Sequence, residues 1–241
     1  MRSPRNTDSI AGELDAIVPN QLAAEGSTAA ERRIAERLIQ SLRPVTPLPS
    51  RAVLVGAFLA IFAAVTALLF AFVGTRGAEN MTFLQLAGIL AAILTAAGLA
   101  SFSLSGEMTP GQRRLVRPGT MTAGILFILF ALIWALFPWT EGTVQGWHCF
   151  LSGFVCSIPA VILVLWVVRQ GTPLAYGPVG ATAGLLGGLV GMAAIHVGCS
   201  LLNAPHMAAA HLTIPLAGAI IGYLAGRALP YLLPPQPGLT I

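Results

Sequence analysis

Six long apolar runs dominate the sequence and constrain its fold more than any other feature. A helix needs about 20 apolar residues to cross a hydrocarbon core of about 30 Å, and each run approaches that length. The runs cover residues 52–73, 83–102, 121–137, 149–168, 176–197 and 207–226. The chain is 56% hydrophobic and only 9% charged, whereas about a quarter of an ordinary soluble domain is charged. The sequence therefore predicts an all-α, polytopic membrane bundle of six transmembrane helices.

Polar segments flank the apolar runs and divide the chain into three predicted parts. Residues 1–50 form an N-terminal segment, residues 51–229 the transmembrane domain, and residues 230–241 a tail. We expect no secretory signal peptide, because the first apolar run starts only after a long polar or mixed stretch. Residues 1–26 lack apolar periodicity, which is typical of a flexible segment.

The arginines are distributed unevenly around the six runs, and lysine is absent. Seven arginines lie at or before residue 51, three lie within 113–117, and one each follows the fourth and sixth runs. Only Arg76, between the first and second runs, falls on the opposite side of the membrane. Because positive charge near helix ends marks the cytoplasm, we expect both termini to be cytoplasmic. The N-terminal segment mixes its arginines with acidic residues and contains no groove-reading motif, so we expect no nucleic-acid partner.

A short amphipathic helix is predicted near the end of the N-terminal segment. Thr28 and Glu31 have the spacing of a capping box, in which each side chain bonds the backbone of the other residue. The apolar stripe that follows consists of Ile34, Leu38, Ile39 and Leu42. Pro44 ends the helix before a proline-rich spacer. The stripe must be buried, either on membrane lipid or the bundle, or in the groove of a partner protein.

The cysteines and histidines gather toward the predicted outer ends of the last three spans. The candidate metal-ligating residues are His148, Cys149, His196, Cys199, His206 and His211. Thiolate and imidazole suit zinc, cadmium or similar ions, and four such ligands satisfy a tetrahedral site. A redox-responsive site is an alternative, because an outer thiol meets an oxidising compartment. Simple packing of each cysteine and histidine is the third interpretation.

The three cysteines differ in their predicted depth in the membrane. Cys149 and Cys199 lie at the outer ends of spans four and five, whereas Cys156 lies two turns deeper. The thiolate is the form that binds metal and reacts, and its charge is costly in hydrocarbon. We therefore expect the first two thiols to share a metal ion or form a disulfide, and Cys156 to be a packing residue.

Other patterns limit the remaining functions. The sequence has no H-E-x-x-H, no nucleophile motif and no acid beside a histidine, so an enzyme is not expected. The predicted spans hold no Asp, Glu or Lys, which weakens the alternative of a small transporter or metal-permeating protein. A membrane scaffold without a sensing role is a further alternative. Glycines at four-residue spacing in spans five and six predict that these two helices are neighbours.

Short motifs at several places resemble those of the NrsF family. They are LIQSLRPVTPLP before span one, WHC at the head of span four, VVRQGTPL after it, and H-x-x-C followed by N-x-x-H before span six. The family comprises six-helix anti-sigma factors of the bacterial inner membrane, which negatively regulate extracytoplasmic-function sigma factors. The resemblance covers roughly residues 36–227.

The resemblance implies a regulator that holds a sigma factor through its N-terminal segment and senses heavy metal or oxidant at outer cysteines. By position, Cys149 and Cys199 match the cysteines of the family. The N-terminal L-I-x-x-L-x-P pattern is matched by Leu38, Ile39, Leu42 and Pro44. The chain departs from the family in its longer N-terminal segment and in Ala210, which stands before His211 where an aromatic residue is expected.

Overall fold

The computed structural model describes residues 33–34, 37, 49–108, 117–140, 146–169 and 175–232. The chain divides into two compact units, Met1–Pro47 and Leu48–Ile241. In the first unit the described residues Arg33, Ile34 and Arg37 are helical and exposed. The remainder of the predicted amphipathic helix, including Leu38, Ile39 and Leu42, lies outside the described residues.

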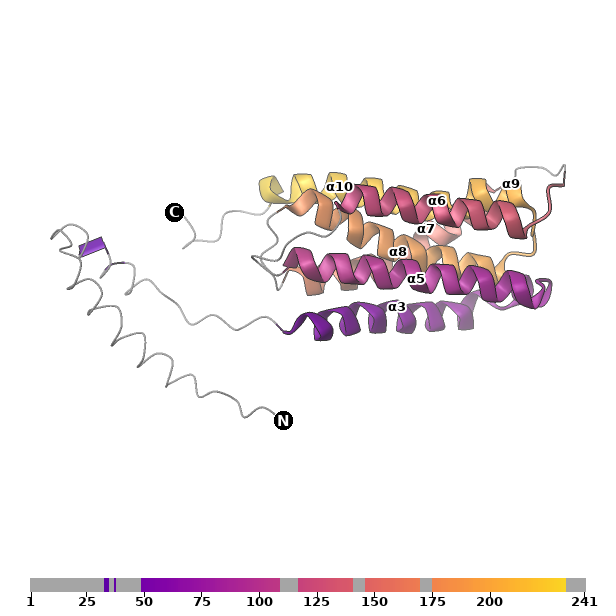
Figure 1. Ribbon diagram of the computed structural model, residues 1–241, viewed down its shortest axis with the longest axis horizontal. Helices are drawn as coiled ribbons and strands as arrows, with labels where there is room; N and C mark the ends of the chain where they lie inside the picture. The colour runs from indigo at the N-terminus through magenta and orange to yellow at the C-terminus, as the bar shows by residue number, and fades with distance from the viewer. Residues whose placement is uncertain are drawn as a thin grey trace, which may run out of the picture. The chain divides into compact units, whose positions relative to one another are not determined.

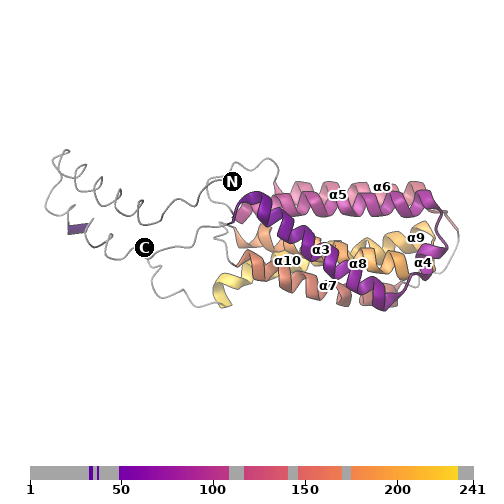
Figure 2. The ribbon, with the colours of Figure 1, turned by 90° about the horizontal axis from the view of Figure 1, so that it is seen from below.

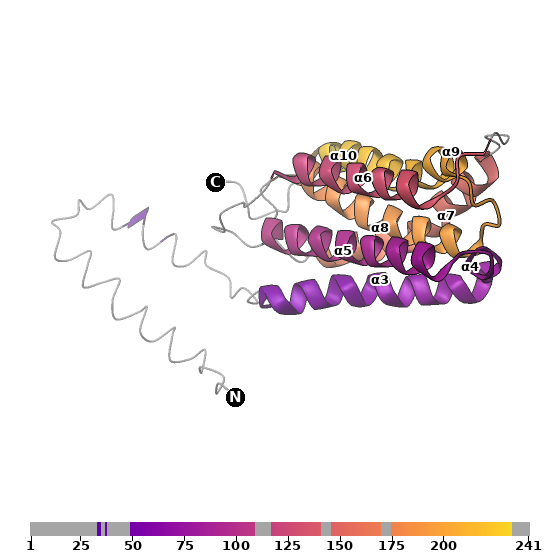
Figure 3. The ribbon, with the colours of Figure 1, turned by 45° about the vertical axis from the view of Figure 1, so that its right-hand side comes forward.

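Six helices of the second unit are long and apolar enough to cross a membrane, which confirms the predicted all-α architecture. They are α3 (Arg51–Val73), α5 (Phe83–Met108), α6 (Pro118–Leu136), α7 (Trp147–Val168), α8 (Tyr176–Gly198) and α10 (Thr213–Leu232). Their axes run side by side (Figure 1). The short helices α4 (Arg76–Glu79) and α9 (Ala204–His206) both lie at the same end of this bundle (Figures 2 and 3). A π-helical turn, η1 (Met207–His211), connects α9 to α10.

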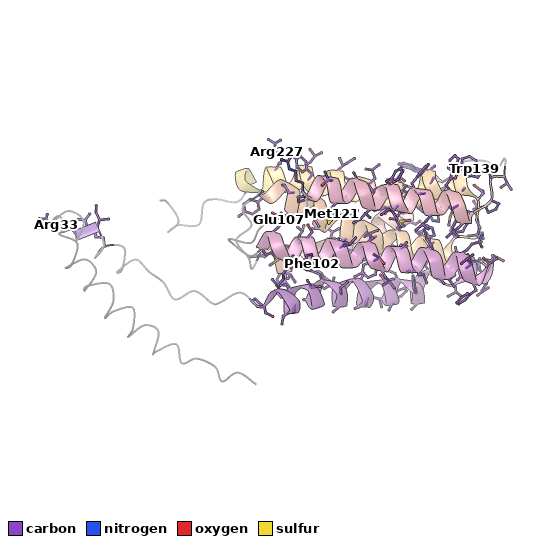
Figure 4. The ribbon with its side chains drawn as sticks, in the orientation of Figure 1. Arg33, Phe102, Glu107, Met121, Trp139 and Arg227 are labelled. Atoms are coloured by element: carbon purple, nitrogen blue, oxygen red, sulfur yellow. The ribbon has the colours of Figure 1, made fainter. Side chains whose placement is uncertain are left out.

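Some helices extend beyond the apolar runs that predicted them. Helix α5 continues to Met108, and its last two turns bury Leu104 and Met108 completely. Glu107 therefore belongs to this helix, at the end of the bundle where Arg227 also lies (Figure 4). Hydropathy locates the hydrocarbon-crossing part of a helix, whereas backbone hydrogen bonds and packing decide where the helix ends.

Helix α8 forms the centre of the bundle. In its most apolar stretch 89% is buried, against 17–39% in the other five spans. It packs most extensively against α10 and α7 and also contacts α3, α5 and α6. The sequence of α8 suits this position, because its many small residues allow neighbouring helices to approach closely.

Glycines on α8 and α10 face one another, as their spacing predicted. A Cβ atom at Gly180 would overlap the carbonyl group of Gly222, and one at Gly184 would overlap that of Gly218. No other residue type fits these positions without separating the helices. The backbones of spans five and six are therefore in direct contact.

Arginines mark one end of the bundle, which we call the arginine end. Arg51 begins α3, Arg117 precedes α6, Arg169 follows α7 and Arg227 lies near the end of α10. Helix α3 begins and α10 ends here, and Trp139 lies at the opposite end (Figures 1 and 4). Arg51 also joins two spans, because its Nη2 donates to the carbonyl of Phe102 at 3.0 Å and its guanidinium lies 3.6 Å from the centre of the Phe102 ring.

Candidate metal centre

Cysteine and histidine side chains from three segments meet at the end of the bundle opposite the arginine end. Cys149 lies in the first turn of α7, and Cys199 is the residue that caps the C-terminus of α8. His206 closes α9, and His211 closes η1. One ligand atom from each of these four residues lies within 4.8 Å of all the others. We call these four residues the Cys/His cluster.

Two contacts define the spacing of the Cys/His cluster. The Sγ atoms of Cys149 and Cys199 are 3.6 Å apart, and the Sγ atom of Cys199 is 3.4 Å from Nε2 of His206. Both thiols are free and half-buried, whereas His206 and His211 are fully buried. The thiols therefore form the accessible edge of the cluster, and the imidazoles form its interior.

These spacings fit a tetrahedral metal ion better than a disulfide. Sulfurs about 2.3 Å from a tetrahedral zinc ion lie about 3.8 Å apart, and a sulfur and an imidazole nitrogen lie about 3.6 Å apart. The two observed distances, 3.6 and 3.4 Å, are close to both values. A disulfide needs a separation of about 2.05 Å, so the thiols would have to move together to form one.

The buried imidazoles also leave nitrogen atoms available. Within the described part of the chain, Nδ1 of His206 and Nε2 of His196 and His211 are buried without a hydrogen-bond partner. A buried polar atom without a partner costs about 1–3 kcal/mol, and a metal ion at His211 Nε2 would relieve one such cost. Two thiols and two imidazoles, with no carboxylate in the cluster, match zinc, cadmium and similar soft or borderline ions.

The π-helical turn brings His206 and His211 to the same site. Five residues of a regular α-helix turn the chain through about 500°, which would place the two side chains about 140° apart. In η1 the backbone N–H of Leu212 instead bonds the carbonyl of Met207 at 3.2 Å, five residues back. This wider turn places residues five apart on nearly the same face. The periodicity of the sequence carries no signal of this turn.

Asn203 fixes the start of α9 and with it the position of His206. Its side-chain oxygen accepts a hydrogen bond at 2.9 Å from the backbone N–H of His206. An Asn followed two residues later by Pro205 is a recognisable helix start. The N-x-x-H motif is thus partly a capping motif, a role that we did not assign to Asn203 from the sequence.

Two glycines allow backbone to approach the cluster closely. A Cβ atom at Gly146 would meet Ala210 and lie 3.5 Å from Nδ1 of His206. A Cβ atom at Gly77, in α4, would meet the carbonyl oxygens of His196, Val197 and Cys199. Helix α4 therefore lies directly against the end of α8 that carries Cys199. Neither contact is visible in the spacing of the sequence.

Comparison with known proteins supports a regulatory function. The family model of negative regulators of sigma F, NrsF, matches residues 38–230. The chain belongs to the NrsF family. The family name makes it a negative regulator of a sigma factor, and this family implies a non-enzymatic role. No curated protein and no solved structure matches the chain.

Not all of the predicted ligands belong to the Cys/His cluster of this NrsF family member. His148 is exposed on α7 and makes none of the described contacts with the cluster. His196 is buried beside the cluster, and its Nδ1 is 3.1 Å from Nδ1 of His211. Cys156 is half-buried farther along α7. Metal binding by the six predicted residues stays a prediction, and the geometry favours four of them.

Proposed function

We propose that this protein is a membrane-bound anti-sigma factor whose Cys/His cluster senses a metal ion. Its N-terminal segment sequesters an extracytoplasmic-function sigma factor and releases it when the cluster changes state. The observation that carries the sensing role is the convergence of four ligand atoms within 4.8 Å of one another. The arginine distribution supports cytoplasmic termini and an outer cluster. We place the protein in the inner membrane of a bacterium because its family regulates a sigma factor, which is a bacterial transcription factor.

The position of the cluster suits transmission of a signal. Cys149, Cys199, His206 and His211 would hold a metal ion between the outer ends of α7, α8 and span six, and the bound ion would link these three ends. Helix α8 contacts α3, and α3 follows directly on the N-terminal segment. A change at the end of α8 thus has a packed route to α3, the helix that follows the proposed sigma-binding segment in the sequence. Such coupling requires the metal ion to bind two states of the bundle unequally.

Accessibility supports metal or oxidant as the class of signal. The half-buried thiols form the open edge of the cluster, so a soft ion reaches sulfur ligands first. Oxidation of the same thiols to a disulfide is the second way to change the state of this site, because the sulfurs are already in contact. The metal-bound form needs less movement than the disulfide.

Co-purification from the host membrane tests the regulatory function. We expect the full chain to retain an extracytoplasmic-function sigma factor, identified by mass spectrometry, and a variant without residues 1–50 to lose it. Replacing Leu38 and Leu42 by Asp should have the same effect without impairing membrane insertion, because an unpaired charge in an apolar groove costs several kcal/mol. Ala23→Asp with Ala24→Asp is the matched control. If the deletion variant and the Leu38, Leu42 variant retained as much sigma factor as the full chain, the sigma-binding site would lie outside residues 1–50.

Metal addition tests the sensing function in the same preparation. We expect zinc or cadmium to release the sigma factor from the full chain. Cys149→Ser and Cys199→Ser should each prevent release, since each removes one of four ligands. Normal release from the double variant Cys149→Ser, Cys199→Ser would contradict a sensing role for the Cys/His cluster.

A further inference from the structure

His196 lies beside the Cys/His cluster, but the contacts of its ring are not those of a metal ligand. Its ring is fully buried, and its Nδ1 atom faces two groups at once. The carbonyl oxygen of Met192, in α8, is 3.3 Å away, and Nδ1 of His211 is 3.1 Å away. The two imidazole rings meet edge to face, with their centres 4.6 Å apart. Nδ1 of His196 thus lies within hydrogen-bond distance of two atoms. The carbonyl oxygen can only accept a hydrogen bond, whereas the ring nitrogen of His211 can either accept or donate one.

Hydrogen-bond chemistry limits which proton arrangements are compatible with these contacts. A carbonyl oxygen only accepts, so His196 must carry its ring proton on Nδ1 to bond Met192. Two Nδ1 atoms in contact need one proton between them, so His211 then presents a lone pair at Nδ1 and carries its own proton on Nε2. In this arrangement His211 Nε2 has no lone pair for a metal ion.

Metal binding demands the opposite arrangement. Of the two ring nitrogens of His211, Nε2 is the one buried without a hydrogen-bond partner among the described residues, and it is the atom left for a metal ion. A ligating histidine donates its other ring N–H to a neighbouring acceptor. For His211 that neighbour is Nδ1 of His196, which must then accept and cannot donate to Met192.

We propose that His196 is a positioning residue, which presents Nε2 of His211 to the metal ion and exchanges its bond with Met192 for one with His211 when the metal binds. The inference rests on the metal-sensing function proposed above. It also extends that function, because the exchange connects occupancy of the Cys/His cluster to the backbone of the central helix α8.

The protons balance in this exchange. The proton between the two Nδ1 atoms passes from His196 to His211. Nε2 of His211 releases its proton to water as the metal ion binds, and Nε2 of His196 takes up one proton from water, so both rings stay neutral. The thiols of Cys149 and Cys199 each release a proton as they bind the metal ion, as thiolate ligation requires.

Cobalt(II) titration of the purified full chain in detergent tests the positioning role. Cobalt replaces zinc in a tetrahedral site and reports sulfur ligation through its absorption spectrum. We expect His196→Leu to weaken cobalt affinity by about 10- to 100-fold, as loss of such a neighbour does at other metal sites. His196→Asn should recover most of this affinity, because its amide oxygen lies as far from Cβ as Nδ1 does. Leucine and asparagine have similar shapes, so the pair separates hydrogen bonding from packing.

His148→Leu is the control, because His148 is exposed and belongs to the same end of the bundle. We expect it to bind cobalt with unchanged affinity. Unchanged affinity in His196→Leu, or equal losses in the Leu and Asn variants, would overturn the positioning role alone. Failure of the unsubstituted chain to bind cobalt through sulfur would overturn both this inference and the metal-sensing function.

Nitrogen-15 NMR of the histidine rings tests the proton exchange itself, because the two neutral tautomers have distinct nitrogen shifts. We expect His196 to carry its proton on Nδ1 in the metal-free protein and on Nε2 after zinc is added. A purely structural role for His196 predicts no change of tautomer. The same tautomer in both states would overturn the exchange.

Discussion

Gly77 shows how a residue outside the Cys/His cluster controls its geometry. Its backbone lies against the last carbonyl groups of α8, where a helix leaves acceptors without intrahelical partners. Any side chain at this position would push α4 away from the turn that carries Cys199. The position of the Cys199 sulfur therefore depends on a glycine more than one hundred residues earlier in the sequence.

Gly77→Ala should weaken metal binding while leaving the six spans intact. The added Cβ would meet three carbonyl oxygens, and the turn at Cys199 must shift to accommodate it. Cobalt titration measures the metal affinity, and the midpoint of thermal unfolding measures the stability of the six spans. Gly124→Ala is the control, since a Cβ there meets nothing within 4 Å. Normal cobalt affinity in Gly77→Ala would mean that α4 does not constrain Cys199.

Thiol labelling should distinguish the three cysteines in whole cells. We expect added zinc or cadmium to protect Cys149 and Cys199 together, because their sulfurs are 3.6 Å apart and belong to one group of ligands. Cys156→Ser should leave both the protection and the metal response nearly intact. Loss of the response in Cys156→Ser would show that the deeper thiol takes part in sensing.

At the scale of the helices, the contact between α8 and α10 is the least tolerant of change. Backbone meets backbone at Gly180 with Gly222 and at Gly184 with Gly218, so there is no flexible side chain to move aside. Span six carries His206 and His211 at its start, and α8 ends beside Cys199. This close contact holds two sides of the Cys/His cluster together.

Gly184→Ala should destabilise the bundle. Overpacking of a well-packed core costs about 1–3 kcal/mol, and a clash with backbone belongs at the upper end of that range. Thermal unfolding in detergent measures the effect. Gly98→Ala adds the same methyl group in open space and should stabilise its helix by about 0.5–1 kcal/mol. Equal midpoints for the two variants would contradict direct backbone contact between α8 and α10.

For the whole molecule, the two ends of the bundle differ in chemistry. One end has Arg51, Arg117, Arg169 and Arg227, and the other has the Cys/His cluster. Six spans carry the chain back to the end where it began. A regulator that senses on one side of a membrane and binds its partner on the other needs this polarity.

Reporter fusions measure the orientation directly. Fusions after Arg117 and Arg169 should behave as cytoplasmic, and fusions near Glu141 and Asn203 as extracytoplasmic, because arginines near helix ends stay in the cytoplasm. An inverted pattern would place the Cys/His cluster in the cytoplasm and exclude an outer sensor. Insertion of an arginine pair in the outer loop offers a control for the sensitivity of the reporter.

The sequence by itself determined the six spans and the contact between spans five and six. Each of these features depends on local composition or regular spacing: a span must be apolar along its own length, and a glycine ridge repeats every four residues. The proximity of Cys149 and Cys199 was also predictable from the sequence, since both residues lie at the outer ends of consecutive spans. None of these inferences requires knowledge of how distant segments pack.

Only the tertiary structure decided which cysteines and histidines share a site. His148 and Cys149 are adjacent in sequence, yet only the sulfur belongs to the cluster, because neighbours on a helix point in different directions. His206 and His211 converge through a π-helical turn that has no periodic signature. His196 lies beside His211 because α8 and span six are in backbone contact. Ligand geometry depends on ångström-scale distances between segments far apart in the chain, and those distances are set by packing rather than by composition.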